Sequence, residues 1–542
     1  MLEKLCRSFG PFEAPVPMEI LGDDVHETVR LRRIRFISHS FQGSEINIYA
    51  LWGEPLSPPP EAKLPALLHI HGGTQTADLD HVLYFARCGY SALSFDWSGP
   101  TRTRTEKFSS RFPEMIAPMD VHDGPPEYAR ILHVVWAARR ALTLLASQPR
   151  IDSSRMGAVG ISWGGLAVWL LNGIDKRLAA AVPVYGCGLY SSYTTYPGWM
   201  ECFHPDRWAH SQHAPLFHLN GTNDFFGSLE ALETYWNDLP VEKRLCLSAN
   251  EDHGLEESTK SFVRKWLDAK LIKPCPLPPV PELSLEIQDG GLWVEVFAPE
   301  AIQVRIYYAV SGDGTRPGAY WYLGPWGRAP SGFFSAKWHL PLGSRRVCVF
   351  AEAQYQDGST QSSFPYDCFE KIGTIALAAF DASIWYDPRM GKTPWFTRWH
   401  LRGSGLTPGQ GNMTLQKSLA DSRLCITQHY LNQASRFEAT LRRPACPVVG
   451  RGEGSTLSLQ LYCPEGAHLV LAVSSAVSPK TFEQGKSQQL ERKIPSSPRW
   501  LQLLIPESDW EPFDFKETRL LHLCASSPGR QSIEIGRIQT TA

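Results

Sequence analysis

The stretch GISWGG at residues 160–165 places a serine between glycines, where a strand-like apolar run gives way to a helix-like one. Gly160, Ser162 and Gly164 match the pattern G-x-S-x-G, in which a sharp strand-to-helix turn exposes the serine hydroxyl. Small neighbours permit that tight turn, and the start of the following helix favours an anionic intermediate. Structural turns with a capping serine also match this pattern. It therefore predicts a nucleophile only when other residues support it.

The sequence around this turn alternates short apolar runs with helical stretches such as HVLYFARCG and SLEALETYWNDL. The apolar runs lie at residues 66–70, 91–96, 157–161, 180–185, 215–219 and 244–248. This succession predicts a doubly wound, mostly parallel sheet with helices on both faces, which is an α/β fold. A strand pair at residues 31–38 and 45–53, joined by HSFQG, is expected before it.

The later part of the chain has a different pattern. Proline-rich IKPCPLPPVPEL predicts a stiff linker at residues 273–282. Beyond it, short alternating runs separated by Gly, Ser and Pro predict one or two all-β sandwich domains, with a boundary in the turn-rich segment 389–411. We therefore predict an α/β domain at 1–272, an immunoglobulin- or fibronectin-like sandwich at 283–395 and a jelly-roll-like sandwich at 396–542. The last resembles carbohydrate-binding modules in its strand pattern, and a purely packing or oligomerisation role remains an alternative.

Charge and cysteine patterns limit the partners. The chain has 53 Lys and Arg against 55 Asp and Glu, a net charge of −2, and no long block of either sign. This argues against nucleic acid and anionic membranes as partners. The 12 cysteines form no C-x-x-C pair or zinc-finger spacing, so we expect free thiols and no metal. With no apolar signal-like or membrane-spanning stretch, a cytoplasmic location is expected; export and the oligomeric state are left open.

A serine nucleophile needs an oxyanion hole. HIHGG at residues 69–73 follows an apolar strand, and its glycines allow backbone N–H groups to approach a substrate oxygen. We predict the N–H groups of Trp163 and Gly73 as the donors, with Gly72 and Thr74 as alternatives. Gly72, Thr74 and Trp97 are also predicted to contact substrate. His69 and His71 alternate faces on a strand with no third ligand, which favours packing or hydrogen bonding over metal binding.

The serine also needs a base and an acid that orients the base. PLFHLNGTNDFFG carries Asp224 in the turn after a strand, and RLCLSANEDHG carries His253 in the same position after the next strand. Both therefore lie at the carboxyl ends of predicted parallel strands, where ligands bind. Asn223 carries no negative charge with which to orient an imidazolium, whereas Glu251 and Asp252 remain rivals for the acid.

Segment 188–208, GLYSSYTTYPGWMECFHPDRW, is predicted to form a lid-like insertion over the pocket. Its aromatic residues suit stacking on a sugar ring or closing the insertion's own small core, and both alternatives stay open.

Five stretches together resemble a known group of proteins: HIHGGTQTAD, GYSALSFDWSGP, RRALTLLASQPRIDSSRMGAVGISWGGLAVWLL, AAAVPVYGCG and NGTNDFFGSLEA. Over about residues 30–270 the chain is similar to α/β-hydrolases of the acetyl xylan esterase and dienelactone hydrolase-like group. The resemblance implies a Ser162, Asp224, His253 triad that hydrolyses carboxylic esters through an acyl-enzyme. The serine at position 162 departs from dienelactone hydrolases, whose nucleophile is cysteine, and the propeller of prolyl oligopeptidases is missing.

The sequence thus predicts a serine esterase acting on small acyl esters, with acetyl groups on carbohydrate as the leading candidate and no cofactor. An amidase or peptidase with the same triad is one alternative. A catalytically idle carbohydrate-binding or scaffold protein is another.

Overall fold

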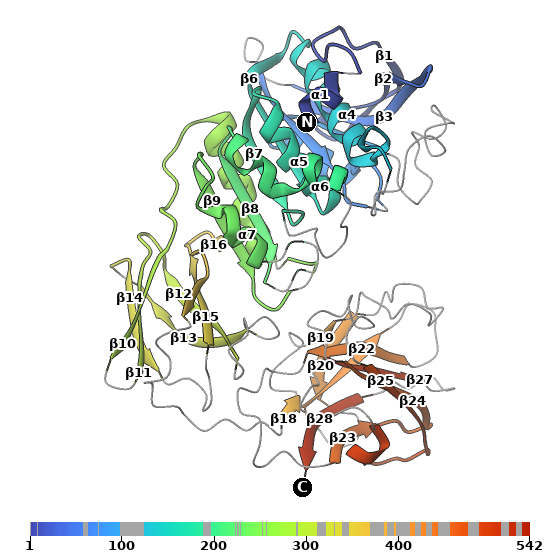
Figure 1. Cartoon of the computed structure of the whole chain (residues 1–542), viewed down its shortest axis with the longest axis vertical. Helices are drawn as coiled ribbons and strands as arrows, with labels where there is room; N and C mark the ends of the chain where they lie inside the picture. The colour runs from blue at the N-terminus through green and yellow to red at the C-terminus, as the bar shows by residue number, and fades with distance from the viewer. Residues whose placement is uncertain are drawn as a thin grey trace. The chain divides into compact units, whose positions relative to one another are not determined.

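The chain is divided into two compact units in a computed structural model, shown in Figure 1. The residues that the structure describes are 2–7, 9–57, 63–73, 75–97, 124–187, 197–222, 224, 227, 229–251, 253–255, 257–288, 291–311, 321–329, 331–338, 346–368, 384–386, 395–396, 412–417, 424–429, 436–442, 456–474, 487–510, 520–526 and 534–541. The first unit comprises residues 1–248, 253–280 and 357–361, and the second comprises residues 249–252, 281–356 and 362–542.

A twisted sheet runs through the first unit in the order β1-β2-β3-β5-β4-β6-β7-β8-β9. Its strands are β1 (Met18–His26), β2 (Val29–Phe41), β3 (Ser44–Pro55), β4 (Leu64–Ile70), β5 (Ser91–Phe95), β6 (Ile151–Ile161), β7 (Leu178–Val184), β8 (Leu216–Gly221) and β9 (Lys243–Ser248). The strands from β5 to β9 pair in parallel, whereas β1, β2 and β3 pair antiparallel and β3 joins β5 antiparallel. The predicted doubly wound, mostly parallel sheet is confirmed.

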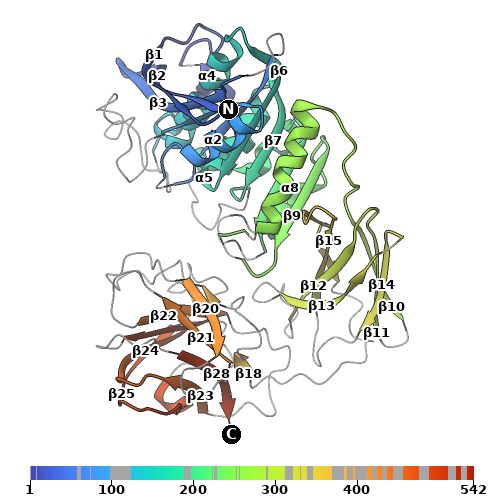
Figure 2. The same ribbon diagram turned by 180° about the vertical axis from the view of Figure 1, so that it is seen from behind.

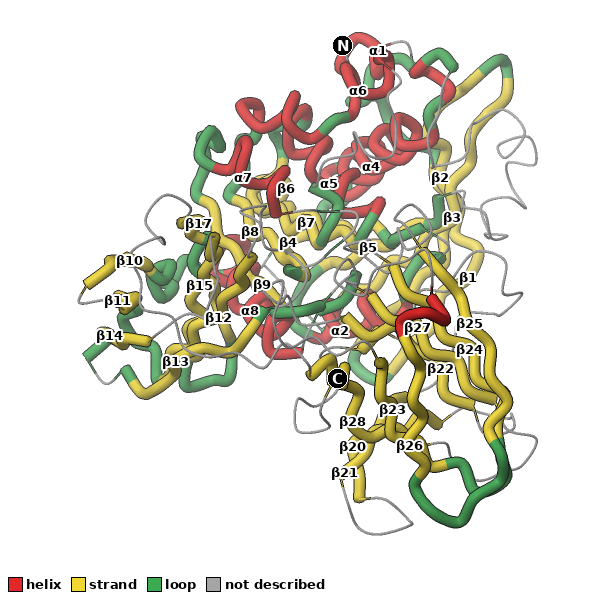
Figure 3. Tube along the Cα trace, turned by 60° about the horizontal axis from the view of Figure 1, so that its bottom comes forward, coloured by secondary structure: helices red, strands yellow, loops and turns green. Residues whose placement is uncertain are grey.

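Helices cover both faces of this sheet, as Figure 3 shows, with α4, α5, α6 and α7 on one face and α2 and α8 on the other. Figure 2 gives the view of α2 and α8 from behind. The helices of the unit are α1 (Leu2–Arg7), α2 (Leu79–Arg87), η2 (Pro126–Tyr128), α4 (Arg130–Ala146), α5 (Trp163–Ile174), α6 (Pro197–Phe203), η4 (Pro205–Ser211), α7 (Leu229–Trp236), α8 (Glu257–Leu267) and the π-helical turn η5 (Asp268–Ile272). None of the helices in the described residues has the length and apolarity that a membrane crossing requires.

The central strands are buried on both faces. Every residue of β4, β5 and β8 is buried, which explains why these strands are continuous apolar runs and not alternating ones. Asp78, the residue before helix α2, caps the helix, because its side chain accepts a hydrogen bond of 2.9 Å from the His81 N–H. The predicted helices and strands therefore arise from burial patterns that the sequence carries directly.

Strands β1 and β6 differ from the prediction. Strand β1 was not predicted, because it is an edge strand whose residues are all exposed or half-buried. Strand β6 begins at Ile151, several residues before the apolar run. Its early part is polar and is held by Arg155, which donates to Asp152 (2.8 Å) and to the Lys63 carbonyl (2.6 Å). Hydrophobic periodicity cannot detect such polar support.

The second unit consists of β-sheets. One sheet has the order β10-β11-β14, while β12 pairs with β13 and β15, and β15 pairs with β17. These strands are β10 (Glu282–Gln288), β11 (Gly291–Phe297), β12 (Gln303–Ser311), β13 (Tyr322–Arg328), β14 (Phe333–Trp338), β15 (Arg346–Gln354) and β17 (Tyr366–Cys368), and the short β16 (Thr360–Ser362) begins in residues of the first unit.

The last part of the chain forms two further sheets, with orders β20-β21-β28-β23-β26 and β19-β22-β27-β24-β25; β18 pairs with β28. Their elements are β18 (Ile384–Tyr386), β19 (Trp395–Phe396), β20 (Asn412–Lys417), β21 (Leu424–His429), β22 (Arg436–Arg442), β23 (Thr456–Tyr462), β24 (Ala467–Ser474), β25 (Ser487–Ile494), β26 (Leu501–Pro506), η9 (Glu507–Trp510), β27 (Leu520–Ser526) and β28 (Glu534–Thr541). The additional β-sheets after the α/β part are thus confirmed. The predicted boundaries and sandwich classes stay predictions, and segment 389–411 lies, apart from β19, outside the described residues.

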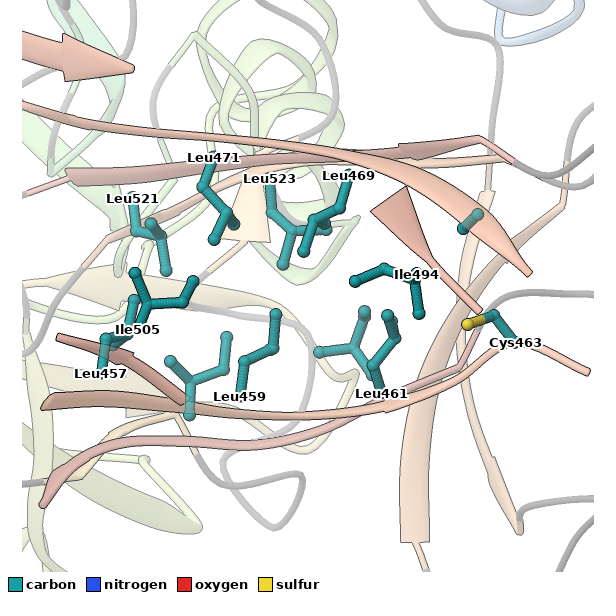
Figure 4. Packing of buried hydrophobic residues seen from close by; sticks show 13 residues of the cluster. Leu457, Leu459, Leu461, Cys463, Leu469, Leu471, Ile494, Ile505, Leu521 and Leu523 are labelled. Carbon is teal, nitrogen blue, oxygen red and sulfur yellow. The ribbon is translucent and has the colours of Figure 1, made fainter. Parts of the chain in front are cut away.

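A leucine-rich core lies between these two sheets, as Figure 4 shows. Leu459 on β23 contributes from one sheet, and Leu471 on β24 and Leu523 on β27 contribute from the other; each is fully buried. Inward-facing leucines at alternate positions account for the alternating pattern of the sequence.

Two histidines of the first unit have buried ring nitrogen atoms. The ring of His81 stacks on that of His69 with centroids 3.9 Å apart, and the Nε2 atoms of both are buried without a hydrogen-bond partner in the described residues. Burial lowers the pKa of His81 from 6.5 to about 3. Between these two pH values the His81 ring is protonated in the unfolded chain and neutral in the folded unit. The stabilising effect of the neutral ring is complete above pH 6.5 and is lost as the pH falls towards 3.

We predict that His81→Phe makes the first unit less sensitive to acid. Phenylalanine keeps the ring stack but removes the titrating group. The free energy of unfolding of the variant minus that of the wild type should therefore be up to about 2 kcal/mol larger at pH 5 than at pH 7. Urea unfolding followed by tryptophan fluorescence at both pH values measures this difference. His210→Phe, at a ring that is largely exposed, is the control. An unchanged pH dependence in His81→Phe would contradict the prediction.

Candidate active site

Ser162 stands between β6 and α5 in a strained backbone conformation. Its φ of 60° and ψ of −121° lie in a region that side chains other than glycine rarely adopt. The Ser162 N–H donates to the Val184 carbonyl of β7 (2.9 Å), and its carbonyl accepts from the Leu166 N–H of α5 (3.1 Å). Such strain persists only where the surrounding structure enforces it, and it is concentrated at functional sites.

Close packing at two glycines enforces this turn. A Cβ at Gly160 would lie 2.1 Å from the Gly164 carbonyl oxygen, and a Cβ at Gly164 would lie 2.1 Å from the Ile70 carbonyl oxygen. No side chain fits either distance. The G-x-S-x-G spacing is therefore a steric requirement of α5 passing against β6 and β4.

Ser162, His253 and Asp224 form one hydrogen-bonded chain. The Ser162 Oγ lies 2.7 Å from His253 Nε2, and His253 Nδ1 lies 2.8 Å from Asp224 Oδ2. The Asp224 side chain has no exposed surface, whereas that of His253 is 11% exposed. In this arrangement Nδ1 donates its proton to the carboxylate and Nε2 is left to accept the serine proton. The structure thus brings together three residues that are far apart in the sequence.

The loop that carries Asp224 is held by Asn220, the buried residue near the end of β8. Its Nδ2 donates to the carbonyls of Gly221 (3.0 Å) and Gly227 (2.5 Å). The Gly227 N–H in turn donates to Asp224 Oδ1 (2.8 Å), so both carboxylate oxygens have donors. The sequence analysis missed Asn220 because an Asn-Gly pair after a strand is typical of any turn.

A second strained residue supports the histidine. Tyr185, directly after β7, has a φ of 59°, and its buried ring lies 4.4 Å from the His253 ring, centroid to centroid. This packing limits where the imidazole can rotate. No pattern in the sequence predicted it, since a tyrosine after a strand is common.

The loop after β4 contains Gly73, one of the two predicted oxyanion donors, and the alternatives Gly72 and Thr74. Gly72 lies against the turn, because a Cβ there would be 3.2 Å from the Ile161 carbonyl oxygen and 3.3 Å from Ser162 Cβ. A Cβ at Gly73 would be 3.0 Å from Cδ1 of Trp163, the first residue of α5. Thr74 lies outside the described residues. The glycine loop and the turn at Ser162 are therefore in direct contact.

Trp97 and the two histidines of HIHGG are buried. The Trp97 ring stacks on His71 with an interplanar angle of 8° and a centroid distance of 4.8 Å, and its Nε1–H donates to the His71 carbonyl (3.1 Å). Only 1% of Trp97 is exposed, so it braces this loop; its contact with substrate stays a prediction. His69 Nδ1 lies 2.9 Å from Ser94 Oγ. No group of three or more potential metal ligands is found among the described residues.

The rival residues are placed as follows. The hydrogen bond of His253 Nδ1 is made to Asp224, and Glu251 is half-buried nearby in the chain. Asn223 and Asp252 lie outside the described residues, as do residues 188–196 of the predicted insertion. In its described part Trp199, Phe203 and Trp208 are buried, and Trp208 Nε1 donates to the Cys202 carbonyl (2.8 Å). These three rings therefore pack into the protein interior.

Residues 24–192 match the family model for acetyl xylan esterase. The first unit is an α/β-hydrolase. The chain is a carboxylic ester hydrolase by this match. The matched residues include β2 to β7 and the turn at Ser162. No curated protein sequence matches the chain.

Solved structures similar to this hydrolase include acetyl xylan esterases and a glucuronoyl esterase. The esterase from Paenibacillus sp. R4 is 18% identical, with a TM-score of 0.40, over 50% of this chain and 92% of that one. The esterase from a Thermoanaerobacterium species is 14% identical, with a TM-score of 0.40, over 49% and 91%. The glucuronoyl esterase from Solibacter usitatus is 12% identical, with a TM-score of 0.36, over 50% and 91%.

We predict that Asn220→Ala displaces Asp224 and slows the reaction of Ser162. Removing Nδ2 takes a donor from the buried Gly227 carbonyl and leaves the Gly221 carbonyl with the Asp224 N–H (3.3 Å), which costs about 1–3 kcal/mol of stability. The rate at which a fluorophosphonate labels Ser162 should fall by at least about tenfold, because the histidine loses its fixed partner. Labelling is followed by mass spectrometry. Asn237→Ala, at an exposed asparagine, is the matched control. Equal labelling rates in the two variants would show that Asn220 does not position the carboxylate.

Proposed function

We propose that the chain is a serine carboxylesterase that removes small acyl groups, acetyl foremost, from carbohydrate. The single observation that carries the proposal is the hydrogen-bonded chain from Ser162 Oγ through His253 to Asp224, with distances of 2.7 and 2.8 Å. The match of residues 24–192 to the acetyl xylan esterase family supports the choice of acyl group and carrier.

In the proposed mechanism, His253 Nε2 takes the proton of Ser162 as the hydroxyl oxygen attacks the ester carbonyl carbon. The carbonyl π pair moves to oxygen, and the N–H groups of Gly73 and Trp163 stabilise this oxyanion. When the pair returns, the bond to the alcohol oxygen breaks and His253 protonates the departing alcohol. His253 then deprotonates a water molecule, whose oxygen attacks the acyl carbon of the acyl-enzyme. The bond between this carbon and Ser162 Oγ breaks, His253 returns the proton to Oγ, and the carboxylic acid is released.

Asp224 orients His253 throughout this cycle. As a buried carboxylate it holds the Nδ1–H tautomer and stabilises the imidazolium that forms after proton transfer. Its effect is large because the surroundings are shielded from water, where charges interact more strongly.

We predict that Ser162→Ala and His253→Gln each lower kcat by at least about a thousandfold, because either change removes the activated nucleophile. Release of nitrophenol from p-nitrophenyl acetate and of acetate from acetylated xylan measures this loss. Ser147→Ala is the control, since that exposed hydroxyl at the end of α4 donates to the Leu144 carbonyl and accepts from the Gln148 amide, away from Ser162 in the sequence. Turnover of Ser162→Ala at the wild-type rate would refute the proposal.

We predict that esters are hydrolysed faster than amides by several orders of magnitude, and acetyl esters faster than butyryl esters by about tenfold or more. A poorer leaving group depends more strongly on proton donation, which makes the amide the harder substrate. Comparing kcat/KM for p-nitrophenyl acetate, p-nitrophenyl butyrate and p-nitroacetanilide tests both differences. A preference for the anilide would favour an amidase instead, and failure to label Ser162 with a fluorophosphonate would favour an idle scaffold.

A further inference from the structure

Hydrogen bonds pair the Gly72 N–H, the Gly72 carbonyl and the His71 carbonyl of the loop after β4. The Gly72 N–H donates to Gln75 Oε1 (2.8 Å), and the Gly72 carbonyl accepts from His71 Nδ1 (2.7 Å). The His71 carbonyl accepts from Trp97 Nε1 (3.1 Å). Within the part of the chain that the structure describes, the Gly73 N–H has no partner. Backbone N–H groups near the protein interior are nearly always paired, so an unpaired one beside a nucleophile is notable.

The tautomer of His71 follows from the same contacts. Nδ1 carries the proton that it donates to Gly72, and Nε2 accepts from the Trp97 N–H at 3.3 Å. Because the ring also stacks flat on Trp97, both its position and its hydrogen-bonding direction are fixed. The peptide between Gly72 and Gly73 is therefore held through its carbonyl oxygen, by a histidine that cannot reverse its donor and acceptor atoms.

Gln75 holds the other side of Gly72. A Cβ at Gly72 would lie 3.0 Å from Gln75 Oε1, so the amide oxygen of Gln75 packs directly against this glycine. Without that acceptor the Gly72 N–H would compete with Gly73 for a developing negative charge, and the peptide planes would be free to rotate.

We propose that Gln75 is a positioning residue of the oxyanion hole, which engages the Gly72 N–H so that the Gly73 N–H is the loop's donor to the oxyanion. This inference rests on the proposed function. It separates Gly73 from Gly72, which the sequence leaves as alternatives, and it gives a role to an exposed glutamine in GGTQTAD. Gln75 acts through the backbone and does not contact the reacting atoms.

The test compares Gln75→Met, which removes the acceptor at similar side-chain length, with Gln75→Glu, which restores an acceptor oxygen. Gln75→Met should lower kcat by about tenfold to a hundredfold and leave KM within about threefold, since oxyanion stabilisation acts in the transition state. Gln75→Glu should recover most of that loss. Gln148→Met is the control, because the Gln148 amide only donates to the Leu144 carbonyl at the end of α4 and to Ser147.

The labelling rate of Ser162 by a fluorophosphonate is measured on the same proteins, because the phosphonyl oxygen also requires the oxyanion donors. This rate keeps the test independent of the natural ester: if wild type hydrolyses no ester, the proposed function fails while the Gln75 comparison can still be made. A circular dichroism spectrum and thermal unfolding curve verify that each variant is folded, and Gln75→Ala provides a second removal.

Slower turnover and labelling in Gln75→Met and Gln75→Ala, with recovery in Gln75→Glu, would support the assignment. Wild-type rates in Gln75→Met would overturn it. A rise in KM at constant kcat would also overturn it, since that result indicates a contact with bound substrate. Equal losses in Gln75→Met and Gln75→Glu would assign the effect to the amide NH2 group and not to the acceptor oxygen.

Discussion

The tight crossing of α5 over the ends of β6 and β4 is the constraint on which the site depends. At Gly160 and Gly164 the backbones are so close that a Cβ would meet a carbonyl oxygen at 2.1 Å, and the residue between them is forced to a φ of 60°. A non-glycine residue in this region costs about 1–3 kcal/mol. The surrounding hydrophobic core supplies that energy, because β4 and α5 are buried almost throughout. The strain is thus a consequence of core packing, and it orients the hydroxyl before any substrate is bound.

The electrostatic part of the site follows from where the strands end. β8 and β9 are neighbouring parallel strands, so the loops after them leave the sheet at the same edge as the turn after β6. A carboxylate buried at this edge requires donors, and Asp224 receives them from Gly227 and His253. Asn220 fixes the loop and Tyr185 packs against the imidazole. The three reacting groups are therefore supported by a second set of residues, of which Asn220 acts through the hydrogen bonds of its Nδ2 and Tyr185 through ring packing.

The sequence predicted the parts of this structure that burial alone determines. Parallel strands such as β4 and β8 are buried on both faces and are visible as continuous apolar runs, and G-x-S-x-G marks the turn because only glycine fits there. Strand β1 and the early part of β6 escaped prediction, since edge exposure and the Asp152–Arg155 contacts leave no periodic signal. Asn220 and Gln75 escaped for a related reason. Polar residues in turns are common, and only three-dimensional contacts show which of them hold a functional loop.

Acid destabilises this hydrolase unit through its buried histidines. Burial lowers the pKa of His133 to about 3 and that of His218 to about 4, so both stay neutral in the folded unit at pH values at which the unfolded chain is protonated. Their contribution to stability declines as the pH falls from 6.5 towards these values. Loss of activity over time at low pH reports this destabilisation.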